Sequence, residues 1–199
     1  MHRSCEAQLA NWVKQVREDD HYQNLSYHHL PLQINLSDPS SVGMDRLVAA
    51  VGANLLRSDK RPAIVVDGGT AITVNLIAGD GAFVGGAILP GFRMAARSLA
   101  VDTDALPEVD VGFDDETPVV GTSTVAALRG GLLWGTVGGV CEIVRRMTRS
   151  LGQTPQMFVT GGNAELLAAH LGQEASWIPD LVLTGIVATA EQEWDTSTE

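Results

Sequence analysis

The chain has 199 residues, enough for one domain or two small halves with a hydrophobic core. Its 24 acidic and 13 basic residues give a net charge of -11, which repels a phosphate backbone, so nucleic acid is not an expected partner. The two cysteines, Cys5 and Cys141, show neither zinc-ligand spacing nor a disulfide framework, which favours a reducing cytoplasm. No apolar run reaches the roughly 20 residues of a membrane span, and residues 1–20 are too polar for a signal peptide, so no membrane association is expected.

The first 60 residues contain signals for two helices and one strand. Apolar residues recur at helical spacing over residues 4–16, and they alternate with polar ones over residues 30–36 as in a short strand. Helical spacing then returns and predicts a helix that begins at residues 43–45. Asp45 and Arg46 therefore fall in the first turn of that helix.

The middle of the chain changes to a strand pattern and then to a long helix. Residues 63–89 contain three apolar runs separated by short turns, which predicts three consecutive antiparallel strands. Residues 92–100 are predicted as a helix, residues 102–118 as an acidic surface loop, and residues 122–150 as a long helix. This long helix contains glycines at positions 130, 131, 135, 138 and 139, each of which costs about 1 kcal/mol relative to alanine. Glycines in such a helix usually permit the close approach of another helix.

The C-terminal part returns to an alternation of strands and helices. Residues 157–169 read as a strand, a glycine pair and a helix, a short strand follows near Trp177, and residues 181–194 form a last helix. No fixed-period repeat is present. The whole pattern predicts an α/β fold.

A tight glycine turn, Gly68 and Gly69, joins two buried strands and is the first candidate for chemistry. The backbone N–H groups of such a turn can hold a phosphate, the hydroxyls of Thr70 and Thr73 add donors, and Asp67 at the strand end can hold a cation. The turn is not a P-loop, because no lysine follows and a strand continues the chain. Asp-Gly between apolar runs is also a common hairpin signal, so a purely structural turn remains the alternative.

The second candidate is the sequence Gly43-Met44-Asp45-Arg46 at a helix start. Its carboxylate could accept a proton from a substrate, and its guanidinium could bind an anionic substrate group. A carboxylate favoured by the helix dipole, beside a solvated arginine, is the structural alternative.

Two further motifs are weaker when taken alone. Residues 158–163 run from a strand into the pair Gly161-Gly162 that opens a helix, an arrangement in which backbone can lie against a nucleotide. Residues 120–124 place hydroxyls, including that of Thr124, at the start of the long helix, where capping alone explains them.

The order of these motifs along the chain resembles the type III pantothenate kinases, a branch of the actin-like sugar-kinase fold. The series is Gly-x-Asp-Arg, Val-Asp-x-Gly-Thr-Ala-x-Thr, Gly-Gly-x-Ile-x-Pro-Gly, a glycine-rich helix and Thr-Gly-Gly, and it extends over residues 5–193. The resemblance implies an α/β, actin-like (ribonuclease H-like) duplicated fold whose first half is incomplete. Residues 1–60 would be the remnant of the first half, and residues 61–199 would form the second half.

The resemblance also implies a function and a role for each motif residue. The activity would be transfer of phosphate from ATP to pantothenate, the first step of coenzyme A synthesis, by a cytoplasmic homodimer that uses Mg²⁺ and either K⁺ or NH₄⁺. Asp45 would accept the proton of the pantothenate hydroxyl, and Asp67 would hold the monovalent cation. The residues implied to bind pantothenate are Gly43, Met44, Arg46 and Thr124, and those implied to bind ATP are Gly68, Gly69, Thr70, Thr73, Gly161 and Gly162.

Three departures from the family pattern affect these expectations. Met44 replaces an alanine, Leu36 replaces a substrate-contacting tyrosine, and no Asp-x-Gly-Asn-Thr hairpin precedes Asp45. The 199 residues alone are therefore expected to be a poor kinase, whose activity such a hairpin would restore. The alternatives are a non-catalytic paralogue acting as a dimeric binding or regulatory module, and an enzyme for another small acid.

Overall fold

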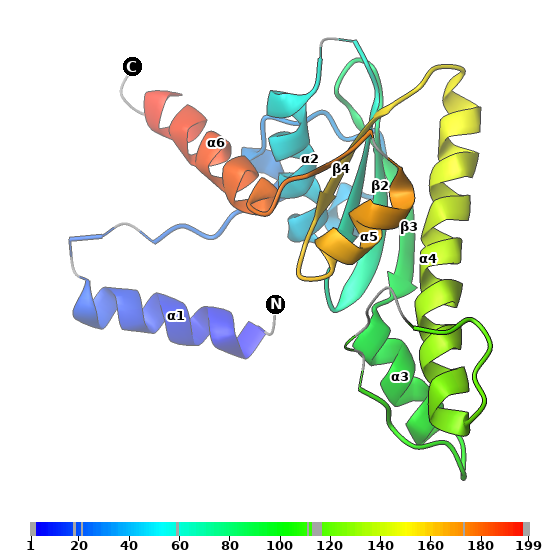
Figure 1. Cartoon of the computed structure of the whole chain (residues 1–199). Helices are drawn as coiled ribbons and strands as arrows, with labels where there is room; N and C mark the ends of the chain where they lie inside the picture. The colour runs from blue at the N-terminus through cyan, green and yellow to red at the C-terminus, as the bar shows by residue number, and fades with distance from the viewer. Residues whose placement is uncertain are drawn as a thin grey trace.

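A mixed five-stranded sheet forms the centre of the protein. The computed structural model describes residues 3–17, 19–20, 22–58, 60–110, 112, 117–172 and 174–196. The sheet has the order β3-β2-β1-β4-β5 (Figure 1). Strands β3, β2 and β1 are antiparallel, and β4 and β5 run parallel to β1. The strands are β1 (Ala63–Gly68), β2 (Ala71–Ile77), β3 (Phe83–Pro90), β4 (Gln156–Thr160) and β5 (Ala175–Trp177).

Helices cover both faces of this sheet. Because successive residues of a strand point to opposite faces, β1 contributes side chains to two separate cores. Ala63 and Val65 of β1 share one core with α2 (Met44–Leu56) and with Leu181 at the start of α6 (Leu181–Thr196). Ile64 and Val66 share the other core with α4 (Thr124–Leu151) and α5 (Ala164–Leu171). The odd-numbered residues of β1, which include Asp67, therefore point toward α2.

Helices α2 and α6 cross in direct backbone contact at two glycines. A Cβ atom on Gly185 would collide with the carbonyl oxygen of Val48, and a Cβ atom on Gly52 would collide with that of Leu181. This contact holds α6 tightly against the middle of α2.

Two further helices lie at the periphery. Helix α3 (Phe92–Val101) follows β3 directly and packs beside the N-terminal end of α4 (Figure 1). Helix α1 (Arg3–Val16) projects away from the sheet (Figure 1), and its apolar residues Leu9, Trp12 and Val16 are about half exposed. Short 3₁₀ helices occur at Tyr27–His29 and Pro39–Ser41.

All the predicted helices are confirmed, as are the three antiparallel strands and the two later strands. In the expected loop, residues 102–110, 112 and 117–118 form neither helix nor strand, and residues 111 and 113–116 lie outside the described part. Within that part, no helix combines the length and the apolar character needed to cross a bilayer.

The strand predicted over residues 30–36 is wrong. Only Ile34 forms a bridge, to Phe83, whose N–H donates to Gln33 and whose carbonyl oxygen accepts from Asn35. A tight turn around Pro31, in which the Leu32 N–H donates to Leu30, interrupts the extended chain. The alternation of apolar and polar residues over residues 30–36 reflects burial, because the apolar residues pack against the core on the α2 side.

The α2–α6 crossing yields a test of the fold. Gly185→Ala should lower the free energy of unfolding by about 2 kcal/mol, because the added methyl group meets backbone that cannot move aside. Gly139→Ala is the matched control, since a Cβ atom there meets only a side-chain methyl group of Leu89, at 3.4 Å, and should raise helix stability by roughly 1 kcal/mol. Urea unfolding followed by circular dichroism measures both, and equal effects of the two changes would contradict the crossing.

Candidate active site

The N-terminus of α2 presents the carboxylate of Asp45. Gly43 is the N-cap residue, and its carbonyl oxygen accepts hydrogen bonds from the N–H groups of Arg46 and Leu47. A Cβ atom on Gly43 would collide with Asp45 Oδ1, so the carboxylate lies back against the start of its own helix. The positive end of the helix dipole stabilises a negative charge at this position. Asp45 is exposed and can meet a substrate.

Arg46 is held by a polar chain that leads into the sheet. Its Nε donates to Asn75 Oδ1 at 2.7 Å, and Asn75 Nδ2 donates to Thr73 Oγ1 at 2.9 Å. The guanidinium also lies over the ring of Phe83, with Cζ 5.5 Å from the ring centre. Burial lowers the pKa of Arg46, and the charge of Asp45 acts in the opposite direction.

Sequence reasoning missed Asn75, which is fully buried and orients Arg46. The available signal was an asparagine inside a strand, where this residue type is depleted. Gly86 on β3 belongs to the same arrangement, because a Cβ atom there would lie 2.9 Å from both the Arg46 guanidinium and Asn75 Oδ1.

Asp67 lies at the end of β1 on the face that α2 covers. Burial raises the pKa of its carboxyl group, and the charge of Asp45 raises it further. The structure therefore brings the predicted proton acceptor and the predicted cation ligand together. In the sheet, Asp67 pairs with Thr73 on one side and with Thr160 on the other.

The Thr-Gly-Gly segment rests directly on the turn after Asp67. Gly161 has a φ of 90°, and a Cβ atom on it would collide with Asp67 Oδ1. The backbone N–H and the side-chain Nδ2 of Asn163 both donate to the Gly68 carbonyl oxygen at 3.0 Å. On the other side, the Gly91 N–H donates to the Thr70 carbonyl oxygen at 3.1 Å. Two segments distant in sequence therefore fix the conformation of one turn.

A cavity of about 710 Å³ opens beside this turn. It brings together four of the six residues that the resemblance assigned to ATP: Gly68, Gly69, Thr70 and Gly162. Gly161 lies against the same turn, whereas Thr73 lies deeper, bonded to Asn75. The remaining lining comes mainly from α3. The volume suits a small-molecule ligand.

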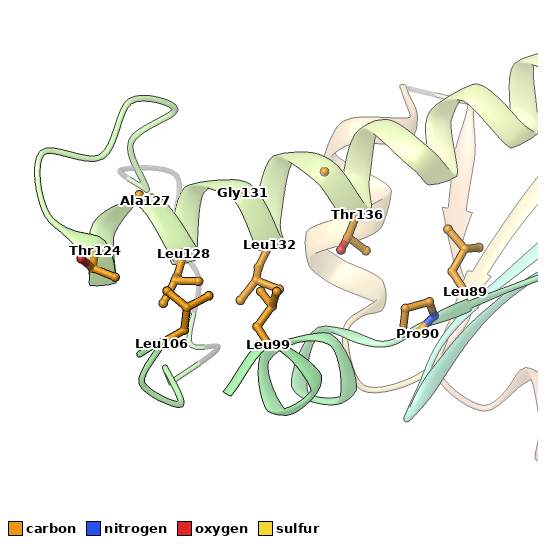
Figure 2. A pocket seen from close by; sticks show the side chains of 11 residues that line it. Leu89, Pro90, Leu99, Leu106, Thr124, Ala127, Leu128, Gly131, Leu132 and Thr136 are labelled. Atoms are coloured by element: carbon orange, nitrogen blue, oxygen red, sulfur yellow. The ribbon is translucent and has the colours of Figure 1, made fainter. Parts of the chain in front are cut away.

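Thr124 is not part of the lining of this cavity. It begins α4 and lines a second cavity of about 480 Å³ between α3, α4 and the end of β3. Figure 2 shows Leu128 and Leu132 of α4 pointing toward Leu99 and Leu106 across this cavity. Asp45 is not part of its lining, so one chain does not bring Thr124 and Asp45 into one pocket.

The surroundings of Asp67 are backbone groups rather than a cluster of metal-binding side chains. Among the described residues, no group of three or more histidine, cysteine, aspartate and glutamate side chains could hold a metal ion. Asp67 has neither a hydrogen-bond donor nor a basic partner within the described ranges, and its carboxylate lies close to Gly69 and Gly161. One uncompensated carboxylate beside peptide groups offers hard oxygen ligands, which alkali cations accept.

The fold is similar to solved structures of low sequence identity. A structure described as a conserved putative Baf family transcriptional activator from Campylobacter jejuni matches 93% of this chain and 79% of its own, with a TM-score of 0.62 and 19% identity. The Alp12 filament structure matches 73% of this chain and 53% of its own, with a TM-score of 0.50 and 10% identity. These likenesses confirm the predicted α/β, actin-like fold class.

Sequence comparison then identifies the family. The family model for type III pantothenate kinase matches residues 5–146. A type III pantothenate kinase of Dehalococcoides mccartyi is 37% identical over 160 residues, which are 78% of this chain and 58% of that protein. One from Dinoroseobacter shibae is 38% identical over 159 residues, which are 79% of this chain and 60% of that protein. The chain belongs to the type III pantothenate kinase family, and it spans slightly under two thirds of the length of these curated relatives.

The raised pKa of Asp67 predicts how stability depends on pH. The native state binds this proton more tightly than the unfolded chain, so stability falls as pH rises from about 4 through the native pKa. Asp67→Asn removes the buried charge and should therefore raise the melting temperature at pH 7, measured without alkali cations. The gain should disappear near pH 3, where the carboxyl group is neutral in both states.

Asp104→Asn is the control for this prediction, because it removes an exposed carboxylate from the loop after α3. It should leave the melting temperature within about one degree at both pH values, as expected for a surface change. A variant Asp67→Asn that melts below the wild type at pH 7 would show that the carboxylate has a stabilising partner.

Proposed function

We propose that this chain carries the catalytic centre of a pantothenate kinase, which transfers the γ-phosphoryl group of ATP to the pantothenate hydroxyl. The observation that supports this most is the convergence of Asp45, Asp67 and the glycine turn at one end of β1. One carboxylate is exposed at a helix start, the other is half buried, and the turn opens into a ligand-sized cavity.

The proposed chemistry assigns a distinct task to each part of the site. The hydroxyl oxygen attacks the γ-phosphorus, the bond from this phosphorus to the β-γ bridging oxygen breaks, and Asp45 accepts the hydroxyl proton. Arg46 uses Nε for Asn75, and its terminal nitrogens have no acceptor in the described part of the chain, so they can bind the substrate carboxylate. Gly43 and Met44 would complete this substrate site.

Residues 68–70, with Gly161, Gly162 and Thr73, would hold the nucleotide. Asp67 would bind K⁺ or NH₄⁺, and that cation, together with the Mg²⁺ that accompanies ATP, would offset negative charge near the phosphates. A cytoplasmic setting is consistent with two free cysteines.

A direct assay tests the proposal. Formation of phosphopantothenate and of ADP is measured with Mg²⁺ in K⁺, NH₄⁺ or Na⁺ buffers. The 199-residue chain is compared with the same chain preceded by an Asp-x-Gly-Asn-Thr hairpin. We expect weak turnover by the first, higher turnover by the second, and higher rates in K⁺ or NH₄⁺ than in Na⁺. Pantothenate binding without any turnover in either form would favour the dimeric binding module instead.

Replacing the proposed base should affect the chemical step specifically. In the form with the higher activity, Asp45→Asn should lower kcat by about two to four orders of magnitude, because the hydroxyl proton loses its acceptor. The melting temperature should change little, since Asp45 is exposed. The control Asp104→Asn should retain full activity, and an equally active Asp45→Asn enzyme would remove Asp45 from the mechanism.

We also propose a homodimer that forms along α4. Cβ atoms on Gly131, Gly135 and Gly138 would meet nothing within 4 Å, so this face of the helix is open to a partner. Gly131 and Gly135 also border the apolar cavity at Thr124, which would enlarge the buried area. A stable interface buries at least about 1,000 Å² in total.

Sedimentation equilibrium should show a dimer at micromolar concentration. Gly135→Arg should give a monomer, because a long charged side chain would stand on the open helix face. Glu165→Arg, which reverses a charge at an exposed position of α5, should leave the dimer intact and serves as the control. A monomeric wild-type chain would overturn the dimer without affecting the proposed chemistry.

A further inference from the structure

Two arginines of α3 face the cavity beside the glycine turn. Arg93 and Arg97 are four residues apart, so their side chains lie on the same side of the helix. Both are exposed, and both line the cavity together with Gly68, Gly69 and Thr70. Neither belongs to the motifs that predicted the site.

The position of α3 relative to the turn is fixed by the structure. Gly91, the N-cap of α3, donates its N–H to Thr70, and a Cβ atom on Gly91 would collide with the carbonyl oxygens of Gly69 and Thr70. Phe92 and Ala96, on the neighbouring face of the helix, are buried. The two arginines are therefore carried by a helix that is anchored at the turn itself.

These two guanidinium groups are also available to a ligand. Within the described ranges neither has an acceptor or an acidic partner, whereas Arg57, Arg145 and Arg146 are held by hydrogen bonds or ion pairs. In a chain with a net charge of -11, two such arginines beside the glycine turn are a local exception. Such a combination attracts a polyanion.

One carboxylate opposes this charge. Asp102 lines the same cavity, and its Oδ2 accepts a hydrogen bond from Ser98 Oγ at 3.0 Å. It offsets one of the two arginines, so these three groups leave one net positive charge. Removal of Asp102 should therefore strengthen anion binding, opposite in sign to removal of an arginine.

We propose that Arg93 and Arg97 form a phosphate clamp that binds the phosphate chain of the nucleotide from the side opposite the glycine turn. This inference rests on the proposed kinase function and adds two binding residues to it. The turn supplies N–H groups from one wall of the cavity, and α3 supplies guanidinium groups from the other. The clamp recognises linked phosphates, whether they belong to ATP or to a free polyphosphate.

Calorimetric titration of the 199-residue chain tests the clamp with two probes, ATP and inorganic tripolyphosphate, in buffer containing EDTA. Arg93→Ala and Arg97→Ala should each weaken binding of both probes about tenfold, the lower range for a hydrogen bond to a charged group. Asp102→Asn should strengthen binding several-fold. Arg149→Ala, which removes an exposed arginine of α4 that is not part of the cavity lining, should leave the affinity unchanged. Alanine is a good helix former, and far-ultraviolet circular dichroism checks that each variant is folded.

The outcomes separate the clamp from the kinase proposal. Binding of ATP with equal affinity by the wild type and the double variant Arg93→Ala/Arg97→Ala overturns the clamp and leaves the kinase proposal standing. Arginine-dependent binding of tripolyphosphate without any binding of ATP supports the clamp and contradicts the nucleotide site. No binding of either probe by the wild type overturns the clamp, whereas the kinase proposal is decided by the turnover assay with and without the added hairpin.

Discussion

The proximity of two carboxylates, Asp45 and Asp67, is the constraint on which the rest of the site depends. Burial raises the pKa of Asp67, and the nearby charge of Asp45 raises it further. The adjacent arginine does not relieve this repulsion fully, because Asn75 holds its Nε on the sheet side. Under the proposed function, a bound cation would offset this negative charge beside the phosphates of the ligand.

Glycines allow the separate segments to reach this point. At Gly43, Gly91 and Gly161 an added methyl group would collide with a carboxylate oxygen or a carbonyl oxygen of the site. Each of the three therefore marks a close approach: helix start to carboxylate, α3 to the glycine turn, and the Thr-Gly-Gly segment to Asp67. Backbone packed this closely moves little, so the turn is held in one conformation before a ligand arrives, which reduces the entropic cost of binding.

The sequence predicted most of this arrangement because its signals are local. Helical spacing placed Asp45 in the first turn of α2, and strand alternation placed Asp67 at the end of β1. Alternation misled at residues 30–36, where burial against α2 produces the same pattern as a strand. The functional roles inferred from the family resemblance stay predictions, since geometry places residues together without showing what they bind.

What the sequence did not reveal depends on contacts between distant segments. Asn75 orients Arg46 across 29 positions, and no local pattern links the two. Arg93 and Arg97 resemble ordinary solvated charges on an amphipathic helix until the Gly91 hydrogen bond sets α3 against the glycine turn. The same helix also reaches the cavity at Thr124 through Leu99. Because α3 lines both cavities and is anchored at its N-terminus, a partner or ligand that displaced it at the Thr124 side would also move its arginines relative to the turn.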